Sequence, residues 1–172
     1  MIPVRVVVVR STKNAMENKK IVTTLCLILQ NGKILLGIKK RGFGQGRWNG
    51  FGGKVKGGET TEDAAKREVL EEVGIEILGA ERVGVIDFKW SDRPEIMEVN
   101  IFRSESFSGE PKETEEMKPR WFELKELNFK EMWADDKYWY PLFLNNKKFR
   151  GKFLFNDLDN VLRHELKEVE EI

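Results

Sequence analysis

The segment that decides the fold runs from Gly53 to Ile75 and reads GKVKGGETTEDAAKREVLEEVGI. Near its middle, Thr60 is followed three residues later by Asp63, a spacing that resembles a helix capping box. Close to its end, Gly74 stands where a glycine commonly terminates a helix. These signals predict one helix over residues 61–73, with a loop on each side.

The predicted helix carries an acidic face. Glu68, Glu71 and Glu72 stand at i, i+3 and i+4, so their side chains project from one side of the helix. Like charges at this spacing destabilise a solvated helix by a few tenths of a kcal/mol per pair, roughly. A hard divalent cation such as Mg²⁺ reverses that effect, because it prefers carboxylate oxygens and shares its coordination with substrate phosphates. For an arbitrary helix, a solvated acidic face is the ordinary alternative.

The flanking segments predict a mixed α/β order around one core. Upstream, residues 21–29 read as a buried strand, Asn31-Gly32 as a hairpin turn, and residues 33–38 as the partner strand. The basic stretch 39–53 is rich in glycine and reads either as a surface connection or, because it contains aromatic residues, as a loop folded against the core. Downstream, the pattern predicts strands at 75–87, 95–102, 119–124 and 149–155, a helix at 136–146, and either a helix or a strand at 160–171.

Composition excludes several classes of function. The 172 residues fit one domain, and the formal charge of +1 gives no strong basic field, so polymeric nucleic acid is not an expected partner. The single cysteine, Cys26, cannot form an internal disulfide and fits a reducing compartment. His164 is the only histidine, which leaves nothing for a Ser-His-Asp triad or a multi-histidine zinc site. No apolar stretch approaches the roughly 20 residues that span a bilayer, so no membrane association is expected.

The first twenty residues differ from the rest of the chain. They contain an apolar run too short for a secretory signal, and no acidic residue before Glu17. We expect residues 1–20 to be an extension upstream of an alternative start at Met16, followed by one domain over 21–172. An organelle-targeting segment is the alternative, because Arg5, Arg10 and Lys13 are basic.

The whole 53–75 string resembles the signature of the Nudix hydrolases, a glycine, five residues, a glutamate, seven residues, then Arg-Glu-aliphatic-x-Glu-Glu-x-Gly-aliphatic. The matching positions are Gly53, Glu59, Arg67, Glu68, Val69, Glu71, Glu72, Gly74 and Ile75. The resemblance implies an α/β/α sandwich with a mixed sheet and a loop-helix-loop catalytic motif. It also implies hydrolysis of nucleoside diphosphates linked to another moiety, with Mg²⁺, or alternatively Mn²⁺, as cofactor.

The same resemblance assigns catalytic roles. It implies that Glu68, Glu71 and Glu72 bind the metal together with the carbonyl of Gly52. Arg67, four residues before Glu71, is expected to orient that carboxylate by a charge-assisted hydrogen bond. Outside the motif, Glu116 matches an acidic position that approaches the metal, as a further ligand or as a base for the attacking water. On its own, a glutamate among several acids is typical of solvent exposure.

Two further segments extend the resemblance to the Nudix hydrolases that act on oxidised purine nucleoside triphosphates. They are GIKKRGFGQGRWNGFGGKV (37–55) and EMWADDKYWYPLFL (131–144), and the match runs from Ile21 to the C-terminus. It implies that Thr24, Asn49, Asp135 and Asp136 recognise the base, that Trp133 stacks on it, and that Phe43, Phe88, Met97 and Trp139 form the pocket walls. It also places Lys39, Phe51, Gly52, Gly53 and Lys54 among the substrate contacts. Without the resemblance, the two tryptophans would be typical core residues. The aspartate pair would be typical of a solvated turn or a helix cap, and Lys39 would be typical of the solvated end of a strand.

Adjacent aspartates inside an apolar pocket have a specific use. Two close carboxylates cannot both ionise cheaply, so one retains its proton. The protonated acid then donates to a purine oxygen, while its ionised neighbour accepts from an N–H group. Exchange of the proton between Asp135 and Asp136 would let one pocket accept guanine-like and adenine-like bases.

The sequence therefore predicts a magnesium-dependent diphosphatase that converts oxidised or methylated purine nucleoside triphosphates, such as 8-oxo-dGTP and 2-oxo-dATP, to the monophosphate and pyrophosphate. We expect a monomer whose partner is the small-molecule nucleotide, located in the cytoplasm, with mitochondria or the nucleus as alternatives. Two other functions remain open. One is hydrolysis of another Nudix substrate, such as a dinucleotide, a nucleotide sugar or an RNA cap, and the other is a non-catalytic nucleotide-binding module.

Overall fold

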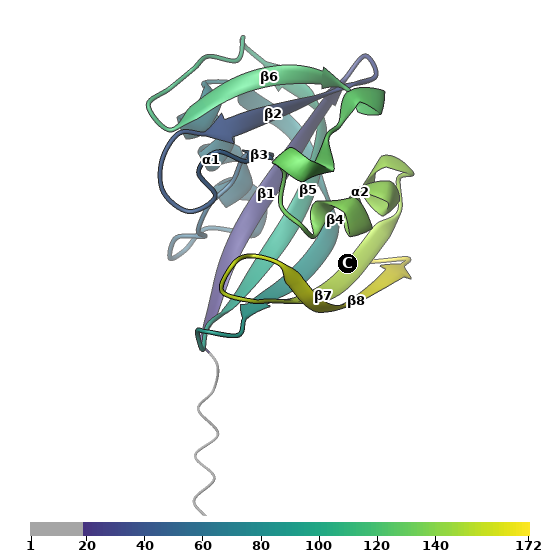
Figure 1. The fold of residues 1–172 in the computed structure, drawn as a ribbon. Helices are drawn as coiled ribbons and strands as arrows, with labels where there is room; N and C mark the ends of the chain where they lie inside the picture. The colour runs from purple at the N-terminus through teal and green to yellow at the C-terminus, as the bar shows by residue number, and fades with distance from the viewer. Residues whose placement is uncertain (1–18) are drawn as a thin grey trace, which may run out of the picture.

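The computed structural model describes residues 19–172, and the predictions for residues 1–18 lie outside the described part. The elements follow one another in an α/β order (Figure 1). They are β1 (Lys20–Gln30), β2 (Lys33–Lys39), β3 (Trp48–Asn49), α1 (Thr61–Val73), β4 (Glu76–Trp90), β5 (Ile96–Ser108), β6 (Met117–Glu123), the 3-10 helices η1 (Leu124–Glu126) and η2 (Phe129–Glu131), α2 (Asp136–Leu144), β7 (Lys148–Phe155) and β8 (Val161–Val169).

The strands form one mixed sheet of eight strands in the order β3-β2-β1-β5-β4-β7-β8, with β6 paired to β2. The pairs β1–β5 and β4–β7 are parallel, and the other pairs are antiparallel. In Figure 1, α1 lies behind this sheet and α2 lies in front of it. The predicted mixed sheet between helical layers is confirmed.

Alternation along β1 explains why both faces of the sheet are covered. Leu25, Leu27 and Leu29 pack in the cluster that contains the side chains of α2. Cys26 and Ile28 pack in the other cluster, with the apolar side of α1. A strand with apolar residues at every position is expected where helices cover both faces. The thiol of Cys26 is fully buried, which raises its pKa to about 12 and leaves it a core side chain.

The first two strands diverge, and this divergence positions the glycine-rich loop. Their turn holds Asn31 and Gly32 at positive φ, and the two strands pair only from Ile28 with Leu35 to the turn. Farther from the turn the loop approaches β1 instead. The amide of Thr24 donates to the carbonyl of Gly53 at 2.9 Å, so the loop before α1 lies directly beside β1.

Most differences from the predicted elements lie at their ends. The strands predicted at 75–87 and 95–102 extend to Trp90 and Ser108, because they continue to pair with each other and with other strands of the sheet. Residues 161–169 form β8, because they pair with β7. Strand β3 and the two 3-10 helices had no clear sequence signal. Among the described residues, no helix is both long enough and apolar enough to cross a membrane.

Candidate functional site

Helix α1 is fixed at both ends by the predicted signals. The Thr60 side chain accepts a hydrogen bond from the amide of Asp63 at 3.1 Å, and Gly74 adopts the left-handed conformation with φ of 73°. The helix buries Ala65 and Val69 against the sheet. Because its register is set in this way, the acidic side chains emerge along the edge that faces the loop before the helix.

Arg67 organises the acidic groups around this edge. Its guanidinium donates to both carboxylate oxygens of Glu59, at 2.5 and 3.0 Å. It also donates to Glu68 at 2.6 Å and to Glu71 at 3.1 Å, as expected for the latter from the i, i+4 spacing. The Arg67 hydrogen bonds are the main cause that lowers the pKa of Glu59 to about 2. The arginine therefore holds three carboxylates in place.

Glu72 differs from the other acids because it is buried, with 4% of its surface exposed. It accepts a hydrogen bond from the amide of Gly52 at 3.1 Å. Burial raises its pKa to about 8; the Gly52 bond and the charge of Lys39 oppose this effect, and the charges of Glu68 and Glu116 add to it. A buried carboxyl beside other acids and with little compensating charge is a site that a cation would stabilise.

Two glycines allow this close approach. A Cβ atom on Gly52 would lie 1.9 Å from the backbone oxygen of Thr24, and one on Gly53 would lie 2.6 Å from the carboxyl carbon of Glu68. Both distances are far below van der Waals contact. Only glycine therefore lets the loop lie between β1 and the acidic face of α1.

The carboxylates of Glu59, Glu68, Glu71 and Glu72 are chemically suited to bind a hard divalent cation. Four carboxylates lie in this region, and their oxygens are the ligands that Mg²⁺ prefers. In the arrangement seen, Glu68 and Glu71 bond to Arg67, while Glu72 bonds to a backbone amide. Accordingly, across residues 19–172 no three acidic, thiol or imidazole side chains already converge at metal-binding distance. Coordination would require these carboxylates to move closer together around the cation.

Glu116 is more exposed to solvent than Glu72. Its carboxylate is half exposed and pairs with Arg41 at 3.2 Å. Its backbone carbonyl accepts from the amide of Lys40 at 2.8 Å, which holds this segment against the start of the glycine-rich loop. The group is near enough to influence the pKa of Glu72, but its role as a ligand or base stays a prediction.

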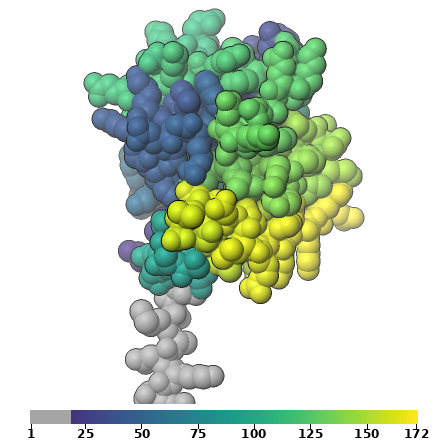
Figure 2. Space-filling view, in the orientation of Figure 1, coloured from purple at the N-terminus to yellow at the C-terminus, as the bar shows by residue number. Residues whose placement is uncertain are grey.

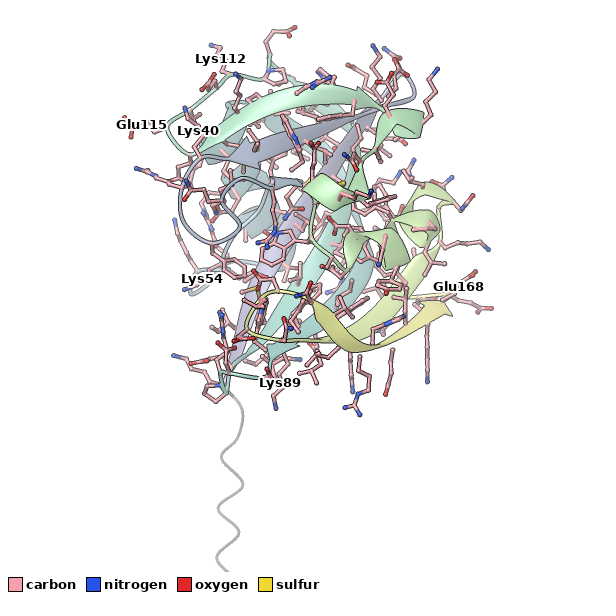
Figure 3. The ribbon with its side chains drawn as sticks, viewed as in Figure 1. Lys40, Lys54, Lys89, Lys112, Glu115 and Glu168 are labelled. Carbon is pink, nitrogen blue, oxygen red and sulfur yellow. The ribbon has the colours of Figure 1, made fainter. Side chains whose placement is uncertain are left out.

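A cavity of about 450 Å³ opens beside this edge of α1, within the size range of small-molecule sites. Its lining includes Glu72 and nearly all the predicted substrate contacts. These are Thr24, Lys39, Phe43, Asn49, Gly52, Gly53, Lys54, Phe88, Met97, Trp133, Asp135, Asp136 and Trp139. Strand, loop and helix segments that are far apart in the sequence thus meet in one cavity. Figure 3 shows Lys40, in the basic loop, and Lys54, directly after it, on the same side of the molecule.

Phe51, which was also expected to contact the substrate, does not line the cavity. Its side chain is fully buried and packs with the α1-side core cluster, away from the cavity. The backbone of Phe51 bonds to Cys26 in both directions, at 2.6 and 3.0 Å. This pairing directs the aromatic ring to the side of the sheet opposite the substrate cavity, so the ring supports the loop from behind.

The aspartate pair lines the cavity together with Trp133 and Trp139 and is almost completely buried. Asp135 accepts from the indole N–H of Trp139 at 2.8 Å, and Asp136 accepts from the amide of Trp133 at 3.2 Å. Burial raises the pKa of Asp135 to about 6. Burial and the adjacent Asp135 charge raise the pKa of Asp136 still further above its usual range. Because burial and mutual repulsion disfavour two charges here, the pair favours a state in which one of the two carboxyls keeps its proton.

Several residues that line the cavity were not among the predicted substrate contacts. Thr23, Trp90 and Phe155 also line it, and the rings of Trp90 and Phe155 stack with centroids 5.2 Å apart. Strand alternation could have identified Trp90, which stands two residues after Phe88 and so shares its face. Thr23 shares a face with Leu25 for the same reason. Phe155 had no such signal, because its position depends on the pairing of β7 with β4.

Comparison with known families matches residues 19–143 to the NUDIX domain. Over 147 residues the chain is 53% identical to the oxidized purine nucleoside triphosphate hydrolase of Mus musculus, a match that covers 86% of this chain and 94% of that protein. It is 50% identical over 149 residues to the protein of the same description from Danio rerio, covering 87% and 96%. Among solved structures, a MutT protein from Bacillus halodurans matches with a TM-score of 0.77 at 26% identity, covering 86% of this chain and 97% of that one.

Proposed function

The chain belongs to the Nudix family of metal-dependent hydrolases, and we propose that it converts oxidised purine nucleoside triphosphates to the monophosphate and pyrophosphate. One observation carries the proposal: Glu72 of the acidic helix and the buried Asp135–Asp136 pair line the same cavity. The first belongs to the motif for phosphate chemistry, and the second suits recognition of a base edge. The two relatives named as oxidized purine nucleoside triphosphate hydrolases support this substrate class.

We propose Mg²⁺ as the metal, held by Glu68, Glu71, Glu72 and the carbonyl of Gly52, because these oxygen ligands match its preference. When bound, such a cation neutralises charge on the phosphate oxygens and makes water a better nucleophile. Arg67 would fix the carboxylates of Glu68 and Glu71 through its present hydrogen bonds. The remaining steps depend on side chains that bind and orient the nucleotide.

The basic groups on the cavity wall suit the phosphate end of the substrate. Lys39 and Lys54 line the cavity together with Glu72. Their charges would attract a triphosphate and hold it beside the acidic helix. This arrangement would position the phosphate chain for in-line attack. The entropic cost of aligning the phosphorus with the attacking water would then be small.

The aromatic and acidic groups suit the purine. Stacking on an aromatic ring such as Trp133 contributes roughly 1–3 kcal/mol per base and tolerates different bases. With one proton shared between Asp135 and Asp136, the pair offers one O–H donor beside carboxylate acceptors. A purine that presents a carbonyl oxygen next to an N–H group satisfies both. The pair therefore selects the base and takes no part in bond cleavage.

A substrate panel tests the proposal directly. At one magnesium concentration, kcat/KM is measured for dGTP, 8-oxo-dGTP and 2-oxo-dATP, together with a dinucleotide and a nucleotide sugar. We expect the oxidised purine triphosphates to be preferred, and pyrophosphate to be released. Faster hydrolysis of the dinucleotide or the nucleotide sugar would overturn the substrate assignment.

Two variants separate the metal assignment from the base assignment. Glu72→Gln removes a proposed metal ligand, so we expect kcat to fall by orders of magnitude with purine affinity largely retained. Asp136→Asn alters the base edge, so we expect weaker substrate affinity and altered selectivity among purines. Normal pyrophosphate release by the first variant would contradict the proposed catalytic role of α1.

We further propose that the protein acts as a monomer in the cytoplasm. The single cysteine suits a reducing compartment, and residues of one chain line the cavity. Sedimentation of the full chain tests the first, and fractionation of cells that express it tests the second.

A further inference from the structure

An ion pair next to two tryptophans of the base cavity joins two segments that are 112 positions apart. Arg47, which directly precedes β3, forms an ion pair with Asp159, with Nη2 and Oδ2 3.1 Å apart. Asp159 lies in the turn between β7 and β8, with φ of 58°. Both side chains are largely shielded, with 32% and 23% exposed. Figure 2 shows the turn, in yellow, beside the blue loop segment on the surface.

The same two residues also contact two cavity tryptophans. The Arg47 guanidinium carbon lies 4.2 Å from the centroid of the Trp133 ring, over its face. The second carboxylate oxygen of Asp159 accepts from the indole N–H of Trp90 at 2.8 Å. The contacts form a continuous chain from Trp90 through the ion pair to Trp133. Both tryptophans line the cavity, whereas neither charged residue does.

The ion pair has no substitute nearby. Among the described residues, it is the one hydrogen bond or ion pair between loop 40–47 and turn 156–160. The other hydrogen bonds and ion pairs of the loop lie within it, to Lys39 at its start, or to residues 113–116. The turn is bonded internally through Asn156. Without the pair, the loop and the turn would be joined only by packing.

We propose that Arg47 and Asp159 form a clasp that positions Trp133 as the platform on which the purine stacks. The guanidinium lies over the Trp133 ring and, together with the Phe43 ring, whose centroid is 4.9 Å away, fixes the position of the indole. Asp159 holds the guanidinium in that position and fixes Trp90 with its other oxygen. Because the clasp is separate from the carboxylates of α1, it governs affinity for the purine and leaves the rate of cleavage unchanged.

This inference rests on the proposed function, since it assumes that a purine stacks on Trp133. A guanidinium shielded from water over an indole face restricts the orientation of the ring, so its loss lets Trp133 leave the position in which a base stacks on it. Arg47→Ala is therefore expected to raise KM for 8-oxo-dGTP about tenfold, with kcat within about twofold of the parent. Calorimetry with 8-oxo-dGMP should give a matching loss of affinity in the absence of turnover.

Two conservative variants divide the clasp into its parts. Asp159→Asn keeps an oxygen to accept from Trp90 but removes the charge that holds Arg47, so it should reproduce most of the Arg47→Ala effect. Arg47→Lys keeps the charge but not the planar stacking group, so it should fall between the parent and Arg47→Ala. In the double variant Arg47→Ala/Asp159→Asn, the loss should be smaller than the product of the two single losses, because both act through one contact.

Arg120→Ala serves as the matched control. Arg120 also lies over an aromatic ring, Phe122, at 4.7 Å, but it does not line the base cavity. The control should leave KM and 8-oxo-dGMP affinity unchanged. A purely structural role for the clasp would lower the melting temperature of the Arg47 and Asp159 variants with KM and affinity unaltered, and this result would overturn the proposal. If the parent hydrolyses no purine triphosphate, the proposed function fails instead, whatever the variants do.

Discussion

The buried carboxyl of Asp135 gives a prediction about stability that can be worked out in detail. Replacement by asparagine keeps an oxygen that can accept from the Trp139 indole N–H, which lies 2.8 Å from the present carboxylate. It removes the negative charge that burial makes unfavourable. Asp135→Asn should therefore be more stable than the parent near neutral pH, even though it loses part of the base-recognition edge.

The sign and the size follow from the pKa of Asp135. Burial raises it from 3.8 to about 6, so between these values the native state binds more protons than the unfolded chain. The contribution of this group to stability is therefore largest below about pH 4 and falls as the pH rises to about 6. The full difference corresponds to about 3 kcal/mol, since each pKa unit is about 1.4 kcal/mol.

The assay is urea unfolding at pH 4, 5, 6 and 7, followed by tryptophan fluorescence. The parent should lose up to about 3 kcal/mol more than Asp135→Asn across this range. Asp157→Asn, at an exposed turn position, is the matched control and should keep the slope of the parent. Parallel pH profiles for the parent and Asp135→Asn would refute the argument, because they would mean that Asp135 titrates normally in the native state.

The remaining predictions concern the core, the loop and the helix cap. The hydroxyl of Tyr140 is buried without a hydrogen-bond partner, so Tyr140→Phe should leave the unfolding free energy unchanged or raise it by about 1 kcal/mol in calorimetry; a clear loss would reveal a missed partner. Gly52→Ala would bring a Cβ to 1.9 Å from the Thr24 carbonyl oxygen, so it should cost at least about 1–3 kcal/mol and abolish pyrophosphate release; a native melting temperature would exclude this tight approach. Thr60→Ala removes the bond to the Asp63 amide and should cost about 1 kcal/mol in urea unfolding with kcat retained at 25 °C, whereas equal stability would show that the cap contributes nothing.

The local features of the site could be predicted because they depend on neighbouring residues. Helix α1 begins after Thr60 and ends before Gly74, as the capping signals indicate. Its spacing alone places Arg67 within hydrogen-bond reach of Glu71. Hydrogen bonds inside one helix are set by chain geometry, so they require no knowledge of the sheet.

The cavity was predictable only in part. The resemblance of segments 37–55 and 131–144 to known enzymes identified most of its lining. It gave no means of telling that Phe51 points into the opposite core, or that Trp90 and Phe155 complete the wall. These positions follow from the face of the sheet that each strand presents, and one change of register would reverse them.

The sequence by itself determined that this chain has an acidic, capped helix and a glycine-rich basic loop, because the relevant contacts are formed within a few residues. The tertiary structure decided which carboxyl groups have shifted pKa values and which distant side chains meet. Glu72 and the Asp135–Asp136 pair have raised pKa values only because packing removes them from water. Arg47 meets Asp159 only because β7 pairs with β4 and brings a distant turn to the loop. Burial and long-range pairing are properties of the assembled sheet, and no short segment contains them.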